Sequence, residues 1–372
     1  MNGIEDFLRK PKYKALELQQ ISRTKKRNLF IAIILLVVVV VSLLLYTANN
    51  RSRNIVIDNL EIISISNIDR LERLDIWGNH SAIFLAVNET NRVLVAGGWS
   101  GISVWDLEIG RIVWDFDRES PDITDIAISP DGILLAACHG RITLLDMTNG
   151  ANLRTLEHPS YMWSVAFAPN GVTLASGSEN GRLALWDLTT GELLTTVTLP
   201  ASTQRNPPAI NPNRITSLAF SPDGVTLAIG RLDGVIYLWD VSTREITATF
   251  HDHTSIVEQI VFDSTGSRLV SASIDHFAII RNLESGQQIT LEHPDYVFSV
   301  SFSVDETMIA SVSQDGFLRV WNLEDGTLLF ERHTQDYWGM QNVEFMENQR
   351  LLLSTGMDGI RWWGVPSIND PD

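Results

Sequence analysis

The chain has 372 residues, of which 44% are hydrophobic, so it can bury one large core or two smaller ones. Its formal net charge of −17 argues against binding to nucleic acid, because that binding needs a basic surface that releases counterions from the phosphates. Cys138 is the single cysteine, which excludes an intrachain disulfide and leaves packing to stabilise the fold.

The N-terminal part divides into a basic tail and an apolar segment. Residues 1–28 hold eight Lys or Arg against three acidic residues, whereas residues 29–46 ("LFIAIILLVVVVVSLLLY") carry no charge. A helix over this segment spans roughly 27 Å, close to the thickness of a hydrocarbon core. We therefore expect one transmembrane helix; a cleaved signal peptide, whose apolar region is normally shorter, is the alternative.

The charges that flank this segment predict its orientation. Basic residues concentrate on the N-terminal side, so residues 1–28 are expected to be a cytoplasmic tail. Residues 47–68 would be a linker, and residues 69–372 an extracytoplasmic domain. The sequence thus predicts a single-pass, integral membrane protein.

From residue 69 onward the sequence repeats with a period near 40 residues. Each unit has runs of four to six apolar residues separated by Pro-Asp-Gly, Asn-Gly or Asp-Gly turns, which predicts short β-strands. The middle runs are apolar at nearly every position, as expected of strands covered on both faces. The repeat is marked by Trp186 in "LALWDL" and its equivalents, with steps of 40, 41, 53, 42, 40 and 42 residues: Trp105, Leu145, Trp186, Trp239, Arg281, Trp321 and Trp363.

Trp-Asp pairs at this period, together with "SPDG" and Asp-Gly turns, resemble the WD-repeat β-propeller family. The resemblance covers roughly residues 69–372 and implies an all-β fold of seven blades, preceded here by the transmembrane α-helix. Only nine residues follow Trp363, too few for another turn and a fourth strand. We therefore expect residues 70–78 ("RLERLDIWG") to close the last blade. The regular repeats and short tail suggest a bacterial protein.

Several units carry a His, a Ser, an Asp and the Trp at matching positions. The complete set is His293, Ser311, Asp315 and Trp321. Ser, His and Asp together can form a hydrolase triad, but an active site occurs once, whereas this group recurs. The family resemblance implies instead a hydrogen-bonded strut within each blade, which satisfies buried polar groups.

The sequence offers few other candidates for chemistry. It has no His/Cys/Asp cluster at metal-ligand spacing and no phosphate-binding Gly-rich loop, so we predict no metal, no cofactor and no enzymatic activity. Asp106, Gly110 and Trp114 match the spacing of the tryptophan-docking motif of quinoprotein-like propellers. This match occurs in only the first of the seven units.

The candidate binding residues lie in loops that the resemblance places on one face of the propeller. Loops "EHPSYMW", "EHPDYVF" and "RHTQDYWGMQ" carry aromatic residues, and an insertion at 199–213 holds four prolines. Exposed aromatic residues are typical of protein-binding hot spots, although they can also simply cover the mouth of the ring. The candidates are Tyr161, Trp163, Tyr296, Phe298, Tyr337, Trp338 and Arg231.

These features together predict a membrane-anchored, non-enzymatic scaffold whose loop face binds an unidentified protein partner. Two alternatives remain. One is an envelope propeller of the quinoprotein-like type, either an assembly factor or an enzyme. The other is a ligand-sensing ectodomain whose short tail recruits a partner.

Overall fold

The computed structural model describes residues 60–78, 82–88, 92–98, 101–116, 123–202, 211–334, 339–346 and 348–367. All of them belong to one compact unit, Arg53–Asp372. The predicted tail 1–28, the predicted membrane span 29–46 and most of the linker lie outside the described residues. Within the described ranges, no helix is long and apolar enough to cross a membrane.

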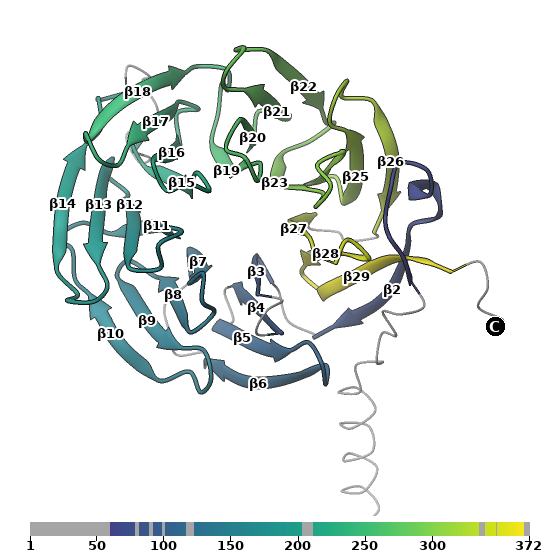
Figure 1. Cartoon of the computed structure of the whole chain (residues 1–372), viewed down its shortest axis with the longest axis horizontal. Helices are drawn as coiled ribbons and strands as arrows, with labels where there is room; N and C mark the ends of the chain where they lie inside the picture. Colours follow the sequence, from purple (N-terminus) through teal and green to yellow (C-terminus); the bar gives the residue numbers. More distant parts are fainter. Residues whose placement is uncertain are drawn as a thin grey trace, which may run out of the picture. The chain divides into compact units, whose positions relative to one another are not determined.

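Seven antiparallel sheets follow one another around a ring, which confirms the predicted all-β, seven-bladed propeller (Figure 1). We number these blades I to VII in chain order. Blade I contains β3 (Phe84–Asn88), β4 (Val93–Gly98), β5 (Gly101–Asp106) and β6 (Arg111–Phe116). Blade II contains β7 (Asp125–Ile128), β8 (Leu134–Cys138), β9 (Ile142–Asp146) and β10 (Asn152–Leu156). Blade III contains β11 (Met162–Phe167), β12 (Thr173–Ser178), β13 (Arg182–Asp187) and β14 (Leu193–Thr198).

Blades IV to VI repeat the same order from the innermost strand to the outermost strand. Blade IV contains β15 (Ile215–Phe220), β16 (Thr226–Arg231), β17 (Ile236–Asp240) and β18 (Glu245–Phe250). Blade V contains β19 (Val257–Phe262), β20 (Arg268–Ser273), β21 (Phe277–Asn282) and β22 (Gln288–Glu292). Blade VI contains β23 (Val297–Phe302), β24 (Met308–Ser313), β25 (Phe317–Asn322) and β26 (Leu328–His333).

Blade VII is built from both ends of the described chain. Strands β27 (Met340–Phe345), β28 (Leu351–Gly356) and β29 (Gly359–Pro366) come from the C-terminal side, and β2 (Glu72–Trp77) pairs with β29 as its outer neighbour. The short β1 (Leu60–Glu61) pairs with the far end of β29, and a 3-10 turn, η2 (Ile68–Arg70), links β1 to β2. This pairing covers an edge that would otherwise be open to another chain.

The core lies between the blades. Seven clusters of buried side chains each join two neighbouring blades around the ring. At the junction of blades IV and V, for example, Ile236 and Leu238 cluster with Val257 and Ile260. Middle strands are therefore covered on both faces, which explains why their sequences are apolar without alternation.

Candidate protein-binding face

The loops before the innermost strands share one face of the ring with the turns between the second and third strands. Backbone hydrogen bonds join them: the carbonyls of Tyr161 in blade III and Tyr296 in blade VI accept from the N–H groups of Glu179 and Gln314, at 3.0 and 2.9 Å. Arg214 makes the equivalent bond in blade IV. We call this side of the propeller the loop face.

Tyr161 and Trp163 form an aromatic pair on the loop face. Tyr161 is 43% exposed, and its ring centroid lies 5.8 Å from that of Trp163. The tyrosine ring rests on Gly140 of the preceding blade, where a Cβ atom would come within 2.5 Å of it. The Arg214 guanidinium lies 3.8 Å from the Trp163 ring centroid and pairs with Glu179 at 3.2 Å. The chain thus fills this site with its own cation.

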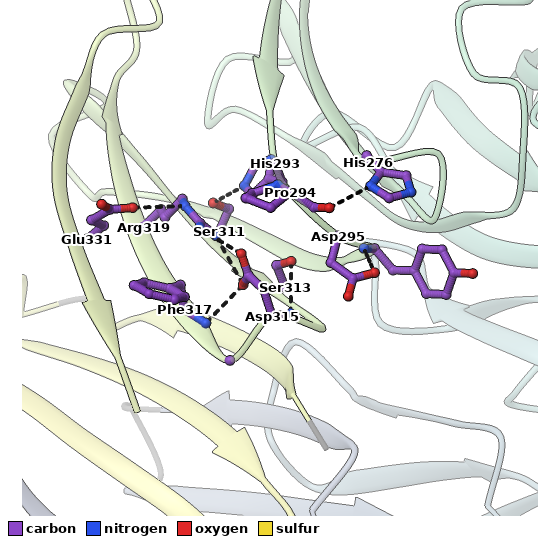
Figure 2. Close-up of polar contacts among 12 residues, drawn as sticks. His276, His293, Pro294, Asp295, Ser311, Ser313, Asp315, Phe317, Arg319 and Glu331 are labelled. Carbon is purple, nitrogen blue, oxygen red and sulfur yellow. Dashed lines mark hydrogen bonds and ion pairs between the residues drawn. The ribbon is translucent and has the colours of Figure 1, made fainter. Parts of the chain in front are cut away.

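Tyr296, at the equivalent position of blade VI, is 42% exposed and meets His276 edge-on at 5.5 Å. His276 has a φ of +78°, although the equivalent turns of other blades use glycine, for example Gly234. This left-handed backbone is costly for a residue with a Cβ. The His276 Nδ1–H donates to the Pro294 carbonyl at 3.1 Å (Figure 2).

Five innermost strands have a β-bulge near their loop-face ends. A bulge leaves one residue out of the ladder and redirects its side chain. The innermost strands surround the centre of the ring (Figure 1), so these residues lie around that centre, at the loop-face ends of their strands. They are Trp163, Thr216, Glu258, Phe298 and Gln341.

Glu258 is a further candidate on the loop face that the sequence analysis missed. It is half-buried, and burial raises its pKa from 4.5 to about 7, against the opposing effect of Arg214. Aligning the repeats on their innermost strands would have found it, because Glu258 stands where blades III and VI have Trp163 and Phe298.

Arg231 is wrongly predicted as a binding residue. Its side chain is fully buried and forms an ion pair with Asp233, while its Nη1 donates to the Pro200 carbonyl at 2.6 Å. A buried, paired guanidinium has no donor to offer a partner. Tyr337 and Trp338 lie outside the described residues.

Three of the four proposed strut residues form a hydrogen-bond chain in blade VI. Trp321 Nε1 and His293 Nε2 each lie 2.8 Å from Ser311 Oγ. Asp315 belongs elsewhere: both of its oxygens bind Arg319, at 3.2 and 2.7 Å (Figure 2), which corrects its inclusion in the strut. In blade V the Asp is included, because His253 binds both Asp275 and Ser271. Ser311 is fully buried, so it cannot act as a nucleophile on a substrate.

Side chains at the start of the innermost strands also tie neighbouring blades together. Asp125 accepts the N–H of Val165 in the next blade at 2.8 Å, and burial raises the pKa of this carboxyl to about 7. Similar bonds of 2.8–3.0 Å link three later junctions: Ser217 to Ile260, Gln259 to Val300, and Ser299 to Val343. They hold the bulged residues in a rigid frame.

Trp114, the residue behind the quinoprotein-like alternative, acts between blades I and II. Its Nε1 donates to the Met147 carbonyl at 2.7 Å, and its ring covers Gly150. This contact joins two blades and brings no reactive group with it. Among the described residues, no group of three or more His, Cys, Asp and Glu is arranged to hold a metal ion.

Two family models match the chain: residues 133–296 match the Nucleolar protein 10-like, N-terminal domain, and residues 286–322 match the WD domain, G-beta repeat. Similar curated proteins include two from Arabidopsis thaliana. WD repeat-containing protein VIP3 is 24% identical over 57% of this chain and 67% of its own length. Periodic tryptophan protein 2 is 25% identical over 59% of this chain but 25% of its own length. WD repeat-containing protein SL1-17 of Schistosoma mansoni is 33% identical over 45% of this chain and 52% of its own length.

These relatives correct the predicted localisation. They are eukaryotic proteins named for their WD or tryptophan repeats, and the longer family match is to a nucleolar protein-like domain. This finding contradicts a single-pass membrane protein with a cytoplasmic N-terminus and an extracytoplasmic propeller. The integral membrane partner and the bacterial origin find no support either.

Proposed function

We propose, from the premise that this chain is a WD-repeat β-propeller, that it is a non-enzymatic platform whose loop face binds a protein partner. The observation that carries this proposal is the pair of exposed tyrosines, Tyr161 and Tyr296, at equivalent positions of blades III and VI. Each is followed two residues later by a bulged aromatic residue, Trp163 or Phe298. Aromatic anchors on a rigid frame are the usual source of binding energy at protein interfaces.

The environment of the tyrosines supports this role. Tyr296 exposes its ring beside a histidine held in a costly backbone conformation, and such strain gathers at functional sites. The polar groups of the strut, by contrast, are buried and engaged with one another. The loop face therefore presents exposed aromatic side chains to a partner, whereas the strut residues are buried.

Site-specific photocrosslinking tests the proposal. A benzoylphenylalanine replaces Tyr161 or Tyr296 in the full chain, and the crosslinked proteins in the source cells are identified. The matched control position is Val225, 48% exposed in the turn between β15 and β16 at the opposite end of the strands. We expect one shared adduct from both tyrosine positions and none from Val225. Equal labelling at all three positions, or labelling at Val225 alone, would refute the proposal.

A further inference from the structure

Glu258 is the acidic member of the bulged residues at the centre of the loop face. It lies between the pairings of Val257 with Ser273 and of Gln259 with Ala272, so it is outside the regular ladder of β19. Its carboxylate has no hydrogen bond or ion pair with any residue that the structure describes. A half-buried carboxylate in that state has lost part of its hydration without a replacement.

Asp125 shows how the same fold treats a buried carboxylate that has a structural task. Its two oxygens accept backbone N–H groups from Val165 and Ile126, each at 2.8 Å. Both Asp125 and Glu258 have a pKa raised to about 7 by burial. Asp125 joins two blades through these bonds, whereas Glu258 forms no hydrogen bond or ion pair within the described ranges.

Arg214 is the nearby cation that acts on Glu258, but its ion pair is with Glu179, at 3.2 Å, and its guanidinium lies against Trp163. This arrangement also shows what the loop face accommodates: a guanidinium between a carboxylate and an aromatic ring. Glu258 offers a second carboxylate on the same face, and Phe298 is the bulged aromatic residue of the next blade.

We propose that Glu258 receives a cationic side chain, lysine or arginine, from the protein partner at the centre of the loop face. The cation would form the direct ion pair that Arg214 does not form with Glu258, and the exposed tyrosines would hold the segment around it. This inference rests on the proposed function and specifies the chemistry of the partner.

Other titratable groups surround Glu258 on the elements packed against β19. The loops before β15 and β23 contribute Arg214, Asp295 and Tyr296, and blade V itself contributes His253, Asp275 and His276. Asp275 is bound to His253, and Asp295 accepts the N–H of Tyr296 at 2.8 Å. Arg231 at the end of β16, which also packs against β19, is paired with Asp233. Four carboxylates (Glu258, Asp233, Asp275 and Asp295) thus outnumber two arginines at this end of the strands, which favours a cationic partner over an anionic one.

Calorimetric titration of the full chain with short capped peptides tests the inference. The probes are Gly-Arg-Gly, Gly-Lys-Gly and the neutral Gly-Gln-Gly. We expect the two cationic peptides to bind and the neutral one not to bind. Because the cation pairs with the ionised carboxylate, affinity should rise about tenfold from pH 6 to pH 8, and binding near pH 7 should release protons.

Substitutions assign the effect to one carboxylate. Glu258→Gln should lower the affinity at least tenfold and abolish proton release. Glu245→Gln, the same change at an exposed position of β18, should alter neither. The inference is overturned if Gly-Gln-Gly binds as well as Gly-Arg-Gly, or if Glu258→Gln, folded by its thermal unfolding curve, keeps its affinity. In the unmodified chain, saturation with Gly-Arg-Gly must also lower the pKa of Glu258, measured by carboxyl NMR.

The photocrosslinking and the peptide titration can give negative results independently of each other. Adducts at Tyr296 without binding of cationic peptides would remove the role of Glu258 and leave the interaction platform standing. Cation binding at Glu258 without adducts at either tyrosine would refute the platform while showing an occupied carboxylate.

Discussion

Replacing Ser311 with alanine removes the centre of the hydrogen-bond chain inside blade VI. His293 Nδ1–H donates to the Leu291 carbonyl at 3.0 Å, so Nε2 is the acceptor of the neutral ring. The Ser311 hydroxyl therefore donates to His293 and accepts from Trp321 Nε1, each at 2.8 Å. Alanine at position 311 leaves one buried acceptor and one buried donor without partners.

The expected loss of stability follows from counting these groups. Each buried polar group without a partner costs about 1–3 kcal/mol, so we expect Ser311→Ala to lower the free energy of unfolding by about 2–4 kcal/mol. Two groups at this cost sum to about 2–6 kcal/mol, and we expect the lower part of that sum because blade IV lacks the equivalent hydrogen bond and still folds. Ile229 stands at the position of Ser311 there, and Trp239 Nε1 has no partner among the described residues.

Blade III provides the matched comparison. Ser176 accepts from Trp186 Nε1 at 2.9 Å, while His158 accepts the N–H of Ser160 instead of binding Ser176. Ser176→Ala therefore leaves one buried group, Trp186 Nε1–H, without a partner, and we expect the free energy of unfolding to fall by about 1–2 kcal/mol. Equilibrium urea unfolding followed by tryptophan fluorescence measures both variants. Equal losses, within about 0.5 kcal/mol, would refute the two-group argument.

Three further predictions concern the titrating and bridging groups. Burial lowers the pKa of His293 to about 4, so its stabilising effect is present above pH 6.5 and is lost as the pH falls toward 4; imidazole ¹⁵N NMR should find the Nδ1–H form throughout pH 5–8, and a titration near 6.5 would contradict the strut. The pKa of Asp125 is raised to about 7, so its contribution to stability falls by about 1.4 kcal/mol between pH 6 and pH 8. In urea unfolding at pH 6 and pH 8, Asp125→Asn should not show this decrease in stability. An equal decrease in the unmodified protein and in Asp125→Asn would disprove the assignment to Asp125. Ser299→Ala removes the acceptor of the Val343 N–H and should cost about 1–2 kcal/mol and speed exchange of that amide; unchanged protection would show that the blade junction does not need the bond.

The propeller could be predicted from the sequence because its information is local and repeated. Glycine turns and apolar runs recur at nearly constant spacing, and a residue such as Trp321 lies at the same offset in its unit as Trp186 in its own. Ser311 and His293 could be grouped with Trp321 for the same reason. Asp315 was misplaced because its partner, Arg319, comes from the next strand and competes for the carboxylate.

The arrangement of the loop face depended on contacts between blades, which spacing along the chain does not reveal. Arg231 was predicted as a binding residue, but its guanidinium is buried and binds Asp233 and the Pro200 carbonyl. Pro200 belongs to the segment that joins blade III to blade IV. Glu258 looked unremarkable within its strand. Its importance appeared only when the bulge placed it beside neighbouring blades, where burial removes water and Arg214 is already engaged. Repetition along the chain therefore specifies the blades. Contacts that join different units of the repeat, such as Arg214 with Glu179 and Asp125 with the Val165 N–H, are decided by tertiary packing, because spacing within one unit does not indicate them.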